Sequence, residues 1–337
     1  MNHIEQNLGI GPSWWSEFIS KFPSDSFEVT DHDFSDHFPK KVFRRGFGTG
    51  YVAGSEIESG FSVLIWNFCL QEEFVYHERS DATNQVIALS FFQSSKPVLN
   101  KNTALDQQVT GLEAIHVSAF ADKNQVTIPA QTAVSLVSIS FTPAWLSHHF
   151  STDSLQNDGF LSGIMNGDTQ PILLNYPLND QGRAIVDILL KLLNRPSIST
   201  TIQVKQSVYE LLVHFFELTL SLSKTLQSVS TKDMRLLSSI EYKYTSNIEK
   251  PLPPIAVLAK EIGMSESKFK LTFKQLYGKS VYDYFLSRRM EKVKQMIATR
   301  AMGVSEAGQY LGYRNLSNFT IAFKKYFGYL PSETKKY

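Results

Sequence analysis

Short apolar runs separated by turn-forming residues dominate the chain between residues 41 and 141. Runs of this kind, rich in Val, Ile and Phe, are typical of the strands of a β-sandwich or barrel. The clearest are Phe61–Leu70, Gln85–Gln93, Leu112–Ala121 and Ala133–Phe141. A short helix is expected before them around Trp14–Ser20. Another is expected through Trp145–Phe150, because Thr142 is a good helix cap and Pro143 is favoured in a first helical turn.

Two longer helices are predicted at residues 181–194 and 202–222. In the second, apolar residues recur at heptad spacing and form a seam: Val204, Val208, Leu211, Phe215, Leu218 and Leu222. This heptad seam packs either against a neighbouring domain of the same chain or against a second chain in a dimer, and the pattern leaves both open. The polar stretch Ser221–Asp233 follows and is the best candidate for a linker.

The last part of the chain contains one pattern twice. Each copy begins with a short amphipathic helix that ends at a glycine, Gly263 in the first and Gly312 in the second. Glycine at this place supports a left-handed turn in which the chain reverses sharply. Ser265 and Asn315 follow these glycines and are placed to cap the next helix.

The helix after each turn is expected to bury one face and expose the other. Its apolar positions are Phe269, Phe273 and Leu276 in the first copy, and Leu316, Phe319, Phe323 and Phe327 in the second. The opposite face carries Lys, Asn, Ser and Thr. This is the pattern of a helix-turn-helix, which holds its second helix by one face and offers the other to a groove of DNA.

A single helix is predicted between the two copies. Ser280 and Asp283 form a plausible capping box, and about 20 residues up to Ile297 continue the helix. Such a helix is roughly 30 Å long. Because one turn of DNA is roughly 34 Å, both recognition helices could enter successive major grooves.

Length and charge add to this picture. A chain of 337 residues exceeds the size of one hydrophobic core, so two domains are expected. The net charge is +1, but from Ser230 onward 19 basic residues oppose 9 acidic ones, a net of +10, which leaves −9 for the rest. A basic rear half is suited to a polyanion, although a solvated basic surface gives the same count.

The stretch Leu252–Lys336 resembles the DNA-binding domain of the AraC/XylS family of transcription regulators. The matching residues are Leu258, Ala259, Gly263, Met264, Ser265, Phe269, Phe273, Lys274, Gly278, Ser280, Tyr284, Arg288, Arg289, Met290, Leu311, Gly312, Tyr313, Phe319, Phe323 to Gly328, Pro331 and Ser332. One departure is Gly308, which stands where the family usually has alanine and is expected to loosen its helix by about 1 kcal/mol.

The resemblance implies a set of DNA contacts. Base edges would be read by Ser267, Lys270, Leu271, Ser317, Asn318 and Ile321. Phosphates would be contacted by Lys268, Lys274, Arg314, Lys324 and Lys325. Leu271 and Ile321 could offer only apolar contact with thymine methyl groups.

The fold expected from these patterns is a two-domain α+β chain. Residues 1–222 would form an effector-sensing and dimerisation domain, β-rich over about 41–141 as a cupin-like barrel or sandwich and helical over about 142–222. A linker at 223–232 would lead to an all-α tandem helix-turn-helix at 233–337. The cupin-like identity of the first domain is implied by the resemblance, since no motif within that region is specific.

The function expected is a cytoplasmic regulator that binds double-stranded promoter DNA and responds to a small-molecule effector. A homodimer through residues 181–222 is possible, RNA polymerase is a partner if the protein activates, and no membrane contact is expected, because no apolar run is long enough to span a bilayer. Two alternatives stay open. One is a cupin-type enzyme carrying a DNA-binding tail, and the other is a ligand-independent dimeric DNA-binding protein.

The sequence contains only weak indications of a catalytic, cofactor-binding or metal-binding site. His77 and His116 are isolated, and adjacent His148 and His149 point apart on a helix, so no metal site or catalytic group is expected. Gly46–Gly50 lacks the spacing of a phosphate loop, and Cys69 is interpreted as a small core residue. No cofactor is predicted, and the residues of any ligand pocket stay unknown. Four strand aromatics either line a barrel pocket or form plain core: Trp66, Phe68, Phe91 and Phe92.

Overall fold

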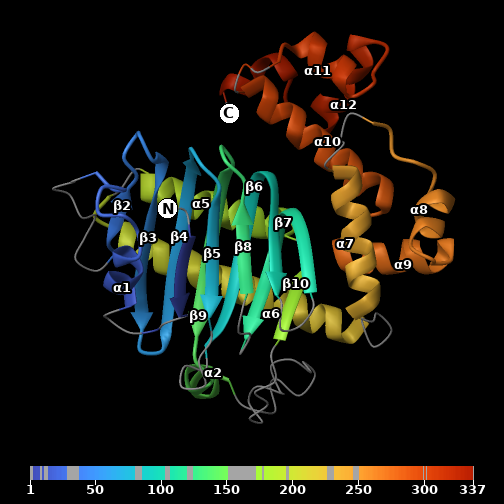
Figure 1. Ribbon diagram of the computed structural model, residues 1–337. Helices are drawn as coiled ribbons and strands as arrows, with labels where there is room; N and C mark the ends of the chain where they lie inside the picture. Colours follow the sequence, from blue (N-terminus) through green and yellow to red (C-terminus); the bar gives the residue numbers. More distant parts are fainter. Residues whose placement is uncertain are drawn as a thin grey trace. The chain divides into compact units, whose positions relative to one another are not determined.

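The computed structural model describes residues 3–7, 10, 14–28, 38–79, 86–102, 107–119, 124–150, 172–176, 178–194, 197–225, 231–245, 250–298, 300 and 302–336. The chain forms two compact units, Met1–Gln227 and Ser228–Tyr337 (Figure 1). We call them the N-terminal and the C-terminal unit. The first is β-rich with helices and the second is helical, which confirms the predicted fold class.

The N-terminal unit is built on a sheet of ten strands within the described residues. These are β1 (His3–Asn7), β2 (Lys40–Val42), β3 (Gly48–Glu58), β4 (Phe61–Leu70), β5 (Phe74–Arg79), β6 (Ile87–Asn102), β7 (Gln107–Ala119), β8 (Asn124–Ile128), β9 (Ala133–Phe141) and β10 (Ile172–Tyr176). Their order is β1-β5-β8-β6-β9-β4-β3-β2, with β7 beside β6 and β10 beside β7. Strands β4 and β9 have the bounds that the sequence predicts, whereas β6 extends well beyond Gln93.

Strand β6 is shared by two halves of this sheet. Its first part, Ile87–Ser94, pairs with β9, and its last part, Leu99–Asn102, pairs with β8. Strand β7 follows both parts, with a break in register between Gln93 and Val98. One continuous strand therefore connects β5 and β8 to β3, β4 and β9 (Figure 1).

Side chains of β4 alternate between two separate cores. Leu64, Trp66 and Phe68 belong to an aromatic-rich core that they share with residues of β5, β8 and α1 (Trp14–Ser20). Val63 and Ile65 belong to a second core on the opposite face. Because successive strand residues point to opposite sides, a strand buried on both faces has a nearly continuous apolar sequence.

The second core lies under two helices, α5 (Asp180–Asn194) and α6 (Thr200–Thr225), which run along one face of the sheet (Figure 1). Four residues of the heptad seam, Val204, Val208, Leu211 and Phe215, are fully buried there. At these four positions the heptad seam packs within its own chain, which is the first of the two alternatives that the sequence leaves open. A dimer cannot form through them, because the chain's own sheet already covers them.

Helix α2 (Pro143–His149) follows β9 as the sequence predicts. The Thr142 hydroxyl oxygen accepts a hydrogen bond from the backbone nitrogen of Trp145 at 3.0 Å, which caps the helix. Its histidines, His148 and His149, are exposed.

The C-terminal unit consists of helices α7 (Thr231–Thr245), α8 (Ile255–Glu261), α9 (Glu266–Tyr277), α10 (Val281–Ala298), α11 (Val304–Tyr310), α12 (Leu316–Phe327) and the 3-10 helix η2 (Pro331–Lys336). One core joins α7, α8, α9 and the start of α10, and another joins the end of α10, α11 and α12. Helices α6 and α7 extend into the predicted linker, as far as Thr225 and from Thr231. Among the described residues, no helix could cross a lipid bilayer.

Candidate nucleic-acid interface and ligand pocket

The first helix-turn-helix motif consists of α8 and α9. Gly263 between them has a φ of +69°, in the left-handed region that residues with a Cβ rarely adopt. The Ser265 hydroxyl oxygen then accepts a hydrogen bond from the backbone nitrogen of Lys268 at 3.3 Å. The predicted turn and the predicted cap are both confirmed.

The second motif, α11 and α12, repeats this arrangement. Gly312 has a φ of +81°, and the Asn315 side-chain oxygen accepts from the backbone nitrogen of Ser317 at 2.7 Å. Helices α9 and α12 each contain 12 residues and end at a left-handed glycine, Gly278 or Gly328. The two recognition helices are therefore alike in length and in both ends.

Equivalent phenylalanines hold the two recognition helices. Phe269 and Phe273 of α9 are fully buried, as are Phe319 and Phe323 of α12. The predicted burial of Leu316 is wrong, since 46% of it is exposed. Leu316 is the first residue of α12, one turn before Phe319, where the helix is not yet enclosed by the core.

The outward faces carry the side chains that the sequence assigns to DNA. All of them are exposed: Ser267, Lys268, Lys270, Leu271 and Lys274 on α9, Arg314 before α12, and Ser317, Asn318, Ile321, Lys324 and Lys325 on α12. Leu271 and Ile321 are 59% and 65% exposed, although both are large and apolar. Each lies two residues before a buried phenylalanine, so the two recognition helices present the same pattern.

Lys268 has a partner within the protein. Its Nζ lies 3.0 Å from a carboxylate oxygen of Asp233, which is buried on α7. This ion pair links α7 to the start of α9. Lys268 therefore contributes to packing within the C-terminal unit, whatever it contacts outside.

Helix α10 connects the two motifs without a break. Its start is capped by Ser280, whose hydroxyl accepts from the backbone nitrogen of Asp283 at 3.2 Å and donates to the Asp283 carboxylate at 2.6 Å. With 18 residues, it is about 27 Å long. The Arg289 guanidinium on α10 donates to the carbonyl of Leu311, which ties the helix to the turn of the second motif.

Gly308 in α11 packs directly against Phe319. A Cβ at this position would lie 3.2 Å from the Phe319 ring. The absence of a side chain thus lets the ring approach the helix closely. The sequence accounts only for the helical propensity lost at Gly308 and misses this contact.

The comparisons with known proteins agree with these motifs. A family model described as a helix-turn-helix domain matches residues 258–337. The chain is 26% identical over 122 residues to the probable transcriptional regulator LumQ of Photobacterium leiognathi, covering 33% of this chain and 49% of LumQ. It is 24% identical over 175 residues to the thermoregulatory protein LcrF of Yersinia pestis, covering 51% of this chain and 62% of LcrF.

A transcriptional regulator from Chromobacterium violaceum with an AraC-type DNA-binding domain is similar to 32% of this chain over 95% of its own length, with 21% identity and a TM-score of 0.29. The chain spans less than two thirds of the length of LumQ and of LcrF. The C-terminal unit is an AraC/XylS-type tandem helix-turn-helix domain, which confirms the resemblance.

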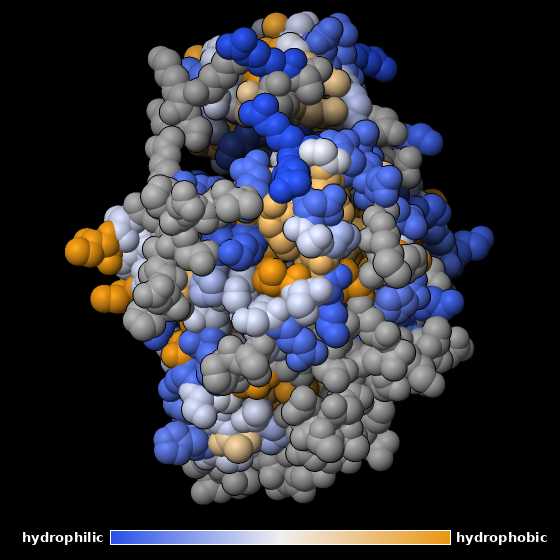
Figure 2. Space-filling model, turned by 60° about the vertical axis from the view of Figure 1, so that its left-hand side comes forward, coloured by the Kyte–Doolittle hydropathy of each residue, from blue (hydrophilic) through white to orange (hydrophobic). Residues whose placement is uncertain are grey.

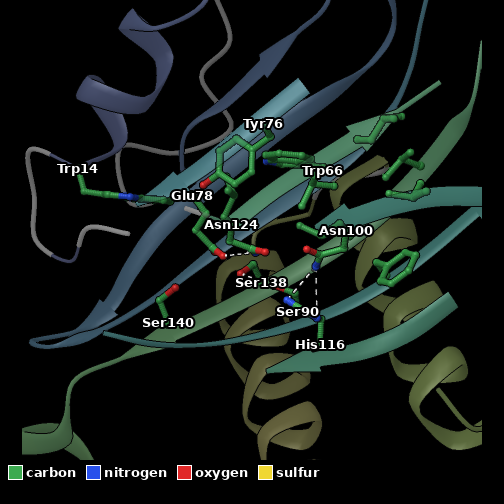
Figure 3. A pocket seen from close by; sticks show the side chains of 17 residues that line it. Trp14, Trp66, Tyr76, Glu78, Ser90, Asn100, His116, Asn124, Ser138 and Ser140 are labelled. Carbon is green, nitrogen blue, oxygen red and sulfur yellow. Dashed lines mark hydrogen bonds between the residues drawn. The ribbon is translucent and has the colours of Figure 1, made fainter. Parts of the chain in front are cut away.

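A pocket lies in the N-terminal unit, between the two halves of the sheet that β6 joins (Figure 3). Its volume, measured as the space that the centre of a water molecule can reach, is about 70 Å³. One water needs roughly 10–15 Å³ by this measure, so a small organic molecule fits. Trp66 and Phe92 line the pocket, whereas Phe68 and Phe91 lie in the two cores. The pocket interpretation therefore holds for Trp66 and Phe92 and the core interpretation for Phe68 and Phe91, and Trp66 belongs to the aromatic-rich core as well.

Polar side chains converge on this mostly apolar pocket. The Asn124 side-chain nitrogen donates to the Glu78 carboxyl at 2.8 Å, and Asn100 lies 2.9 Å from His116 Nε2 (Figure 3). Burial raises the pKa of Glu78, although the hydrogen bond from Asn124 acts in the opposite direction. The Ser90 hydroxyl donates to that of Ser138 at 2.9 Å.

No pattern in the sequence marks Glu78, Asn100, His116 and Asn124 as members of one site. They come from four strands, β5, β6, β7 and β8, and only the fold brings them together. The only indication in the sequence is that polar residues interrupt the apolar runs of these strands. The same pattern is expected where one face of a strand is exposed to solvent. Cys69, expected in the core, is half-buried, and Gly48–Gly50 belongs to β3.

Proposed function

We propose that the chain is a sequence-specific DNA-binding transcription regulator whose α9 and α12 enter successive major grooves. The main support is the exposure of the same positions on two equivalent helices at either end of one connecting helix. At about 27 Å, α10 is close to the roughly 34 Å of one DNA turn. The net charge of +10 from Ser230 onward favours a polyanionic partner.

Within this proposal the outward side chains have two roles. Ser267, Lys270, Ser317 and Asn318 contact base edges, and Leu271 and Ile321 contact thymine methyl groups. Lys274, Arg314, Lys324 and Lys325 contact phosphates, and Lys268 does so only if its ion pair with Asp233 opens or is shared.

Genome-wide mapping of binding sites with the full chain, followed by affinity measurements on the recovered site, tests the proposal. We expect Lys270→Ala and Asn318→Ala each to cost roughly 1–3 kcal/mol and to relax base preference. Lys324→Ala should weaken binding to all sequences alike and reduce the salt dependence of affinity.

The matched control is Lys191→Ala, which removes one exposed lysine from α5 in the N-terminal unit. Its affinity for DNA should equal that of the unmodified chain. If Lys270→Ala and Asn318→Ala both leave affinity and base preference unchanged, the assignment of these faces is wrong.

A small-molecule effector bound in the N-terminal pocket is part of the proposal, because the pocket has room for one and contains buried polar groups. Pockets of this kind are the usual places for ligands. A thermal-shift screen tests this part. An N-terminal unit that no small molecule stabilises would favour the ligand-independent alternative.

A homodimer through the helices of residues 181–222 is also proposed, by their outer face instead of the heptad seam. Ile188 of α5 and Ile202 and Val213 of α6 are 49%, 73% and 54% exposed. Ile202 and Val213 are eleven positions apart, three helical turns, and so share one face. The space-filling view shows apolar groups between hydrophilic ones on the surface it presents (Figure 2).

The alternative of a cupin-type enzyme with a DNA-binding tail makes a different prediction. Such an enzyme would copurify with a stoichiometric metal, which elemental analysis would detect. The relatives reported above are named as regulators, and we propose that this chain is one as well. A regulator of this kind works in the cytoplasm, where promoter DNA is found, and contacts RNA polymerase if it activates.

A further inference from the structure

Among the described residues that line the pocket of the N-terminal unit, Glu78 is the only carboxyl group and the His116 ring is the only base. These described lining residues include no lysine or arginine. A ligand with a carboxylate or a phosphate would be buried beside this acid without a cation. Burying such a charge unpaired costs too much, so anionic ligands are disfavoured.

Two amide oxygens in the pocket have no hydrogen-bond donor. Within the described part of the chain, Asn100 Oδ1 and Asn124 Oδ1 are buried and have no partner. Asn124 is completely buried and already uses its nitrogen on Glu78. Buried acceptors without a donor cost free energy, so a ligand that brings N–H or O–H groups gains from meeting them.

The rest of the pocket is apolar and aromatic. Trp14, Trp66 and Tyr76 line it around Glu78 (Figure 3). Aromatic rings attract cations through their electron-rich faces, and the attraction grows where water is excluded. An ammonium group needs a carboxyl group that ionises beside it, several acceptors and no lysine or arginine nearby, and the described lining meets these needs with Glu78 and the amide oxygens. The Trp66 indole nitrogen, also without a partner in the described structure, suits an oxygen elsewhere on a ligand.

We propose that this pocket binds a small apolar molecule that carries one protonated amine, with the ammonium group at Glu78 and Asn124 and the apolar part among Trp14, Trp66 and Tyr76. Among the described residues that line the pocket, no lysine or arginine pairs with the Glu78 carboxyl, and the ligand supplies the cation. The proposal deepens the proposed function, on which it rests only in treating this ligand as the effector.

Calorimetry on the full chain with three probes of nearly equal shape tests the ligand class. Benzylamine, benzyl alcohol and benzoate share a ring and differ in the charge of the attached group. We expect benzylamine to bind at least about tenfold more tightly than benzyl alcohol, and benzoate not to bind. The variant Glu78→Gln should lose about tenfold or more in affinity for benzylamine and keep its affinity for benzyl alcohol.

Glu73→Gln is the matched control, because Glu73 is an exposed carboxylate outside the pocket lining. It should bind benzylamine as the unmodified chain does. Equal binding of the alcohol and the amine would overturn the proposal in favour of a neutral hydroxylated ligand. Three other outcomes would also overturn it. The chain could prefer benzoate, benzylamine could still bind after Glu78→Gln, or none of the probes could bind at millimolar concentration.

This experiment contains no DNA, so its failure is separate from failure of the proposed function. Affinity for the recovered DNA site is measured in parallel, with and without benzylamine. DNA binding without amine binding would reject the ligand class alone. Amine binding in a protein that binds no DNA would reject the regulator and leave the ligand class standing.

Discussion

The Glu78 carboxyl lies inside the N-terminal unit, where burial disfavours its charged form. Its pKa is raised in the folded chain above the value of about 4.3 that glutamate has when unfolded. The folded state therefore binds more protons, and the stability from the neutral acid is lost as the pH rises from about 4.3 through the folded pKa. Glutamine cannot ionise but still accepts the hydrogen bond from Asn124.

Glu78→Gln should thus be as stable as the unmodified chain below about pH 4 and more stable than it at neutral pH. Denaturant unfolding across this pH range, followed by tryptophan fluorescence, measures the difference. Glu73→Gln, at an exposed position outside the pocket lining, is the control for the loss of one carboxylate from the chain. A Glu78→Gln variant that is less stable at neutral pH would mean that the hydrogen bonds of Asn124 and Ser118 to the carboxylate outweigh the cost of its burial.

Gly308 is a second residue whose effect depends on one contact. An alanine there gains about 1 kcal/mol of helix propensity, but its Cβ must displace the Phe319 ring, and overpacking costs about 1–3 kcal/mol. We expect no stabilisation from Gly308→Ala in the unmodified background. In Phe319→Leu, which makes room, the same change should be more favourable, and a double-mutant cycle measures this coupling. If the changes in the free energy of unfolding caused by the two substitutions simply add, the contact between Gly308 and Phe319 is contradicted.

At the scale of elements, each recognition helix depends on its own core. Phe273 of α9 and Phe323 of α12 are fully buried in different clusters at the two ends of α10. Each phenylalanine-to-alanine change should cost about 3–5 kcal/mol through the cavity that it leaves. Thermal unfolding of the full chain and hydrogen exchange measure the total and the local loss.

Because the two cores are separate, Phe273→Ala should raise hydrogen exchange mainly in α8 and α9, and Phe323→Ala mainly in α11 and α12. Leu316→Ala is the control, since Leu316 is largely exposed at the start of α12 and should cost little. Normal melting of either phenylalanine variant would refute the packing of these helices.

At the scale of the whole molecule, we expect one face of helix α6 to be needed for folding and the opposite face for assembly into a dimer. Leu211 is fully buried against the sheet, and Val213, two residues later, is 54% exposed. Leu211→Glu buries an unpaired charge, at a cost of several kcal/mol, and should unfold or aggregate the N-terminal unit. Val213→Glu should leave the fold intact and, if the outer face of the hairpin forms the dimer, convert it to a monomer.

Sedimentation velocity and circular dichroism of the two variants measure these outcomes. Operator affinity of Val213→Glu should also fall, because the second recognition unit is no longer held nearby. A folded, soluble monomer from Leu211→Glu would restore the heptad seam as an interface. An unmodified chain that is monomeric at micromolar concentrations would reject the dimer altogether.

The sequence by itself was sufficient for features that depend on neighbours along the chain. The caps at Ser265 and Asn315, the left-handed turns at Gly263 and Gly312 and the ends of β4 and β9 involve residues a few positions apart. Such features follow from backbone sterics and short hydrogen bonds, which local residue types determine. This is why the helix-turn-helix motifs could be predicted before the fold was known.

The tertiary structure decided what depends on residues far apart in the chain. An apolar heptad seam has the same sequence whether it packs on a sheet or on a partner, and only the position of α6 on the sheet distinguishes the two. The pocket around Glu78 joins four strands, and no local pattern marks its members. Burial, and with it the raised pKa and the unsatisfied amide oxygens, arises only when those strands come together, because it is a property of the surroundings and not of the residue.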